Sequence, residues 1–151
     1  MLKLLRLIVV LAGAALALLV TTPVATAAQV TRFVAPLSAE CDAAVASGAT
    51  GVAFVTVNEA TGRITYRVVA FNLPGTLSAA HIHGPINLTT GNGPVAVPLE
   101  LTGVNSGVVA SGTATDPALA AAIVANPANF YFNLHTTTCP SGALRGTLTP
   151  V

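Results

Sequence analysis

Short segments in which apolar and polar residues alternate constrain this fold more than any other feature of the sequence. The clearest lies at 63–73, where Ile64, Tyr66 and Val68 share one face and arginine and threonine occupy the other. This period of two is typical of a β-strand with one buried face. The loop at 58–62 ends in glycine, which suits a short hairpin with the preceding segment. The sequence therefore predicts a core built from antiparallel strands.

Six further segments are predicted as strands because they are rich in β-branched and aromatic residues and are bounded by turn residues. They lie at 50–57, 79–83, 95–101, 107–115, 130–136 and 144–149. Pro98 has no backbone N–H to donate, so its strand is expected at an edge of the sheet or at a bulge.

One short helix is expected to interrupt the strands. Asp116 is a good N-cap, Pro117 suits the first helical position, and 118–125 is rich in alanine. Asn126 and Pro127 should end the helix. We therefore expect an all-β domain, a β-sandwich or Greek-key barrel of the immunoglobulin-like or superoxide-dismutase-like kind, with one short helix.

The N-terminal segment has the order of features found in a secretory signal peptide. Lys3 and Arg6 precede an apolar run at 7–20, and small residues follow up to Ala28. The run is short for a membrane span of about 20 residues, although an uncleaved anchor is the alternative. We predict a signal peptide over 1–28 and a domain over 29–151. The mature protein would then be secreted or held in the cell envelope, with no membrane span.

The charge of the predicted domain excludes one class of partner. From residue 29 onward the chain has four arginines, five acidic residues and no lysine, so its net charge is about minus one. Nucleic-acid binding rests on neutralising several phosphates with a basic patch or run. Nucleic acid is therefore not expected as a partner.

Two cysteines, Cys41 and Cys139, lie near opposite ends of the domain. An even number of cysteines in an exported protein predicts a disulfide. Closing so long a loop would contribute roughly 4–5 kcal/mol in the chain-entropy description. Two separate buried thiols are the alternative. A metal site that uses both cysteines is disfavoured, because neither belongs to a close pair.

The alternation also predicts which side chains form the core. In the strand at 130–136, Phe130, Phe132 and Leu134 should point one way, and Tyr131, Asn133 and His135 the other. The full predicted core is Phe54 or Val55, Ile64, Tyr66, Val68, Val97, Leu99, Phe130, Phe132, Leu134 and Leu148.

Three stretches, in this order and spacing, resemble the CHRD domain, a module repeated in chordin. They are Ala-Ala-His-Ile-His-Gly-Pro at 79–85 followed by Gly-Asn-Gly-Pro-Val at 91–95, Phe-Asn-Leu-His-Thr at 132–136, and Pro-Ser-Gly-Ala-Leu-Arg-Gly at 140–146. The likeness covers about 31–151 and includes the hairpin at 59–62. It implies an extracellular immunoglobulin-like or related β fold. It implies no reaction, because CHRD domains have no generally assigned catalytic activity.

The chain departs from the CHRD pattern at two positions of the last motif. Ala143 stands where the family usually has an acid, and Cys139 stands where asparagine is common. An acid–arginine pair inside that turn is therefore not available. A disulfide to Cys41 is expected to anchor the turn instead.

All three histidines of the predicted domain fall in the motifs that carry the resemblance. His81 and His83 are two residues apart and should project from one face of a strand, while His135 lies on the polar face of another. If the strands are neighbours, His81 and His135 should lie close together. Three imidazoles with an open position suit Zn or Cu, provided that the ligand nitrogens come within about 4 Å of one another.

The same histidines can instead hold loop backbone, because an imidazole can both donate and accept a hydrogen bond. The sequence favours this structural role for His81, His83 and His135 over a metal or an organic ligand. Arg145 can grip a carboxylate with its planar fork, but it is expected to bind carbonyls of the neighbouring turn. Asn133 is a further candidate for a ligand-binding or structural role.

The expected function is that of a non-catalytic extracellular or exported interaction or structural module of unknown ligand. The alternative is an exported Cu or Zn protein that uses the three histidines. No catalytic or cofactor-binding residue is assigned, because the chain has neither a Gly-x-Ser-x-Gly elbow nor a close pair of carboxylates. A Ser–His–acid triad is recognised by geometry, so the sequence leaves a hydrolase open.

Overall fold

The computed structural model describes residues 29–42, 45–46 and 48–151. The predicted signal peptide over 1–28 therefore lies outside the described residues. The elements are β1 (Val30–Ala39), β2 (Thr50–Asn58), β3 (Arg63–Phe71), β4 (Leu77–His83), β5 (Val95–Pro98), β6 (Gly107–Thr115), α1 (Pro117–Ala125), the 3-10 turn η1 (Pro127–Asn129), β7 (Tyr131–Thr136), β8 (Leu144–Thr147) and β9 (Thr149–Pro150).

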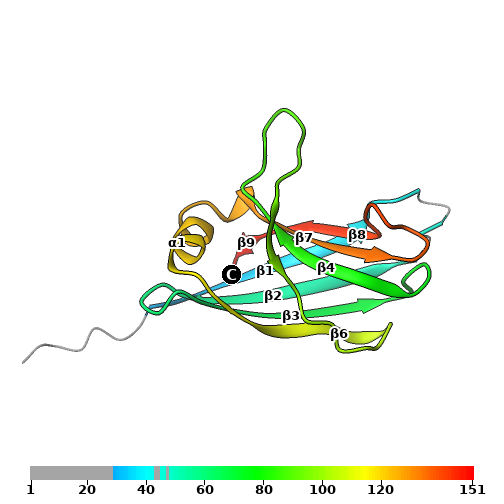
Figure 1. Ribbon diagram of the computed structural model, residues 1–151, viewed down its shortest axis with the longest axis horizontal. Helices are drawn as coiled ribbons and strands as arrows, with labels where there is room; N and C mark the ends of the chain where they lie inside the picture. Colours follow the sequence, from blue (N-terminus) through cyan, green and yellow to red (C-terminus); the bar gives the residue numbers. More distant parts are fainter. Residues whose placement is uncertain (1–28, 43–44, 47) are drawn as a thin grey trace, which may run out of the picture.

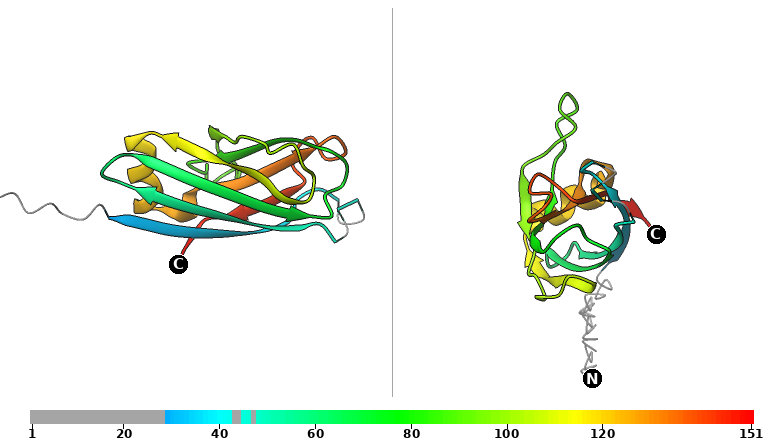
Figure 2. Two further views of the ribbon diagram at one scale, coloured as in Figure 1. Left: turned by 90° about the horizontal axis from the view of Figure 1, so that it is seen from below. Right: turned by 90° about the vertical axis from the view of Figure 1, so that its right-hand side faces the viewer.

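The strands form a single antiparallel sheet that curls into a nearly closed barrel (Figures 1 and 2). The order along the sheet is β5-β4-β7-β8-β1-β2-β3-β6, and β9 pairs with β1. An isolated bridge between Leu101 and Ala110 brings the chain after β5 against β6 and so joins the two ends of this order. Strands β4, β5 and β6 follow one another, and β7 returns beside β4, which is a Greek-key connection. The predicted fold class is confirmed.

Several boundaries differ from those expected. Strand β1 was not predicted, although Phe33, Ala35 and Leu37 alternate and are buried on the barrel side. The strand expected at 95–101 ends at Pro98, and the one at 144–149 is divided into β8 and β9. Pro98 ends a strand whose ladder pairing is with β4 alone, at one end of the strand order, which agrees with its lack of an N–H. The register shift in this pairing lies further back, between the partners Val97 and Val95.

The helix begins as the sequence predicted. The Asp116 carboxylate accepts a hydrogen bond from the Leu119 N–H at 3.0 Å, and Pro117 occupies the first turn. Ala120 and Ile123 are buried where α1 lies at one end of the barrel (Figure 1). No helix in the described part of the chain is long and apolar enough to cross a membrane.

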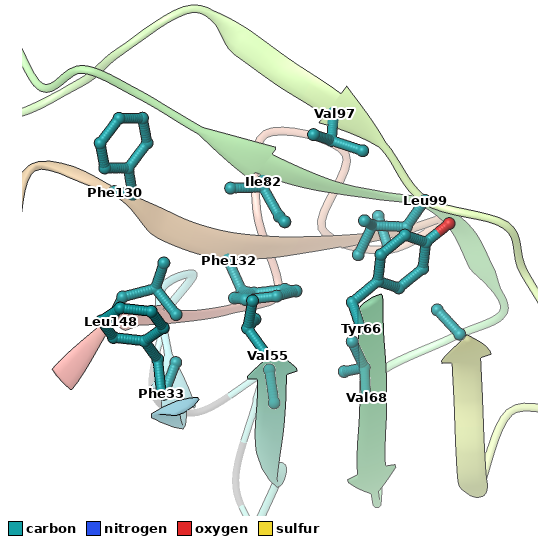
Figure 3. Packing of buried hydrophobic residues seen from close by; sticks show 14 of the residues in the cluster. Phe33, Val55, Tyr66, Val68, Ile82, Val97, Leu99, Phe130, Phe132 and Leu148 are labelled. Atoms are coloured by element: carbon teal, nitrogen blue, oxygen red, sulfur yellow. The ribbon is translucent and has the colours of Figure 1, made fainter. Parts of the chain in front are cut away.

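The barrel interior holds one continuous hydrophobic core (Figure 3). Val55 rather than Phe54 points inward, because the buried positions of β2 are 53, 55 and 57, and Phe54 is 50% exposed. The other predicted core residues are all buried: Ile64, Tyr66, Val68, Val97, Leu99, Phe130, Phe132, Leu134 and Leu148.

The disulfide between Cys41 and Cys139 is confirmed. It joins the segment after β1 to the turn before β8 across 98 residues of sequence, with a Cα–Cα distance of 6.1 Å. Both cysteines are thereby paired, and the alternative of two free thiols is excluded.

Replacing Phe132 with alanine should lower the free energy of unfolding by about 3–5 kcal/mol, because the ring is fully buried and its removal leaves a cavity. Phe54→Ala is the matched control, since it removes the same ring from the outer face of β2 and should cost far less. Urea denaturation of both variants measures the difference. Equal losses would contradict this assignment of the inner and outer faces.

Candidate functional site

The pairing of three strands brings the candidate residues to one patch on the outside of the barrel. In β4 the inward positions are Ala80 and Ile82, so His81 and His83 point outward. Strand β7 runs between β4 and β8 (Figure 1). Its Asn133 is opposite His81 on one side and Arg145 on the other.

The two other outward residues of β7 complete the patch. His135 is paired with Ala79 and Tyr131 with His83. Asn133 therefore stands at the centre, with His81 opposite it on β4, His135 two residues along β7 and Arg145 opposite it on β8. The sequence prediction that His81 and His135 lie close together is confirmed.

The histidines form a short hydrogen-bonded chain. The Nδ1 atom of His81 lies 3.1 Å from Nε2 of His135. The Nδ1 atom of His135 in turn lies 3.0 Å from the carbonyl oxygen of Pro140, and Nδ1 of His83 lies 3.0 Å from the carbonyl oxygen of Gly93. A carbonyl can only accept, so both of these Nδ1 atoms carry the proton and donate.

These donations determine the chemistry of the remaining nitrogens. A neutral imidazole protonated on Nδ1 has a lone pair on Nε2, so the Nε2 atoms of His83 and His135 are both electron-pair donors. Nε2 of His83 is buried and meets no hydrogen-bond partner within the described part of the chain. One nitrogen from each of the three rings can be chosen so that all three lie within 4.8 Å of one another.

A layer of stacked groups connects the histidines to Arg145. The ring of Tyr131 lies parallel to that of His83, with centroids 4.9 Å apart. The guanidinium carbon of Arg145 is 3.6 Å from the centroid of the same tyrosine ring, within the range of a cation–π contact. Tyr131 therefore lies in contact with both His83 and Arg145 and links them.

Arg145 also holds the loop that follows β4, which rises above the barrel in Figure 1. Its guanidinium donates to the Gly91 carbonyl at 2.5 Å and to the Asn92 side-chain oxygen at 2.7 Å. It also pairs with the Glu40 carboxylate at 3.2 Å. We expected Arg145 to bind carbonyls of the neighbouring turn; the backbone carbonyl that it binds is that of Gly91, in the loop after β4.

The sequence did not indicate Glu40, although its carboxylate takes the place of the acid that the CHRD pattern has in the last turn. Ala143 stands at the position of that acid, and Glu40, which is 105 residues before Arg145 in the sequence, pairs with the arginine instead. Its position beside Cys41 was the available signal, because the disulfide brings that segment to the turn. Tyr131 was assigned only to the polar face of its strand.

These residues surround an open pocket of about 380 Å³. Gly142 keeps it open, because a side chain at that position would collide with the Glu40 carboxylate and lie 3.0 Å from the Asn133 oxygen. The pocket is lined by Glu40, His83, Asn92, Gly93, Tyr131, Asn133, His135, Ser141 and Gly142.

The fold and the site define a class: an all-β Greek-key barrel with a polar, histidine-lined pocket on its outer surface. The family model of the CHRD domain matches residues 33–148, nearly the whole described chain. The chain therefore belongs to the CHRD domain family, as its motifs indicated. Comparison with curated proteins and with solved structures gave no match. CHRD domains are typically extracellular and are generally interaction modules rather than enzymes.

The environment of His81 predicts a pH dependence of stability. Burial, followed by the neighbouring His135 and His83, lowers the pKa of His81 below its ordinary value of 6.5. The unfolded chain therefore binds more protons than the folded protein as the pH falls. In the absence of metal, the free energy of unfolding should be highest above about pH 6.5 and decline below it.

Chemical denaturation at a series of pH values measures this profile. His81→Gln keeps a polar side chain but cannot titrate, so its profile should be flatter just below pH 6.5. A variant profile as steep as that of the unmodified protein would show that His81 is not responsible.

Proposed function

We propose that this chain is an exported, non-catalytic CHRD module that binds one Zn or Cu ion through His81, His83 and His135. The observation that carries the proposal is the buried Nε2 atom of His83, which has no hydrogen-bond partner among the described residues, on a ring that is grouped with two further imidazoles. Export is supported by the disulfide and by the usual extracellular setting of the family.

The donor set fits such an ion. Zn binds histidine nitrogens at about 2.0–2.1 Å, which places two ligands of a tetrahedral site about 3.3 Å apart. His81 Nδ1 and His135 Nε2 are 3.1 Å apart. Without metal, His81 Nδ1 carries the proton of this hydrogen bond, so binding through Nδ1 requires that His81 change to the tautomer protonated on Nε2. The whole set spans up to 4.8 Å, which exceeds the separation of about 4 Å that sharing one ion requires, so one ring must turn toward the others on binding.

The carbonyl contacts of the histidines support the same function. Histidines that bind metals usually donate their other N–H to a carbonyl or carboxylate, which fixes the ring orientation and tautomer. His83 and His135 do so to Gly93 and Pro140. Both partners are backbone groups, so they keep the rings in place regardless of side-chain movement.

A purely structural role accounts for only part of this arrangement. The chain from His81 through His135 to Pro140 satisfies two of the rings. It leaves Nε2 of His83 without a donor among the described residues, and an unpaired buried polar atom costs about 1–3 kcal/mol. A metal ion removes this cost, which is why we prefer metal binding to the structural role that the sequence favoured.

Added Zn²⁺ or Cu²⁺ should raise the melting temperature of the metal-free protein. At a free metal concentration of about 100 Kd, mass action contributes roughly 2.7 kcal/mol. The gain should shrink as the pH falls, because protons compete for the imidazoles. Differential scanning fluorimetry and calorimetric titration measure both effects.

His83→Ala should abolish the gain while leaving a folded protein, since it removes the unpaired ligand atom. Ser141→Ala is the matched control, because it lines the same pocket and contributes no imidazole. An equal metal-dependent rise in unmodified protein and His83→Ala, or no rise with either metal, would refute the proposal.

A further inference from the structure

We propose that the pocket beside the three histidines binds a small anion with a carboxylate-like pair of oxygen atoms, as a further ligand of the bound metal. This inference rests on the proposed function, since the anion would coordinate that ion. It names the chemical class of the molecule that the site takes up in addition to the metal.

The charge of the loaded site calls for an anion. Three neutral imidazoles bring no charge, so a divalent ion bound to them keeps its two positive charges. Glu40, which lines the pocket, is paired with Arg145 at 3.2 Å, so its charge is already balanced. An anion bound to the metal would offset its positive charge and so reduce the desolvation free energy of placing that charge in a partly buried site.

The histidine set also leaves a coordination position open. Zn and Cu sites with three protein ligands take a small molecule in the next position. His83, His135 and Asn133 line one pocket, and Gly142 leaves its space clear. An ion held by the histidines would therefore lie beside a space of about 380 Å³, enough for a small anion.

Asn133 supplies the second contact. It is only 5% exposed, lines the pocket, and stands opposite His81 in the strand pairing. Its side-chain amide makes no hydrogen bond with the described residues, and its oxygen is buried without a partner. Since amide oxygen and nitrogen are exchanged by rotation, the N–H₂ group can donate to one oxygen of an anion whose other oxygen is on the metal.

The test uses the full mature chain loaded with Cu²⁺ and formate as the probe. Formate should change the copper EPR spectrum in a saturable way, and it should compete with azide, whose binding gives a charge-transfer absorption. Asn133→Ala should weaken formate binding by about tenfold, the loss of one hydrogen bond to a charged group, while copper affinity stays within about twofold. Thr147→Ala, on the exposed side of β8, is the control and should change neither.

A second variant keeps the test valid if Asn133→Ala does not fold. Asn133→Asp keeps the shape of the side chain and adds a negative charge, so it should prevent formate binding and retain copper. Glu40→Gln tests the alternative that Glu40 itself is the further ligand.

Copper binding with no formate or azide response would overturn this inference and leave the proposed function intact. The same would follow if anions bound only in Glu40→Gln, or equally well in Asn133→Ala. Failure to bind copper at all would overturn both proposals.

Discussion

The backbone pairing of β7 with β4 on one side and β8 on the other is the constraint on which both the core and the site depend. Antiparallel pairing with a period of two assigns alternate residues to opposite faces. Phe132 and Leu134 therefore fill the barrel, while Asn133 and His135 face outward. A slip of β7 by one residue would put Asn133 and His135 in the core and Phe132 in water, so packing enforces the arrangement of the site.

Much of this arrangement could be predicted because alternation is a local property. The segment at 63–73 showed its inner face directly, and the His-x-His pattern showed that two imidazoles share a side. The proximity of His81 to His135 followed from the assumption that their strands are neighbours, which the Greek-key order satisfies. The helix cap at Asp116 was equally local, since a carboxylate just before Pro117 has few other roles.

The remaining features depend on contacts between distant parts of the chain. Nothing near Arg145 in the sequence indicates that its guanidinium would reach Gly91 or Glu40, because those contacts arise from the loop after β4 and from the pairing of β1 with β8. Strand β1 was not predicted because Pro36 interrupts its run of strand-forming residues, although the buried residues of the strand alternate. The carbonyl partners of the histidines belong to turns, whose conformation is set by tertiary packing.

Closure of the barrel limits how this module can recognise another protein. The bridge between Leu101 and Ala110 pairs backbone N–H and C=O groups that an open sheet would leave exposed at its two edges. Open edges are where extended peptides are captured by adding a further strand. Where the bridge joins the chain after β5 to β6, the backbone is already paired and is not open to an added strand. There, side chains on the outer surface are what a binding macromolecule meets.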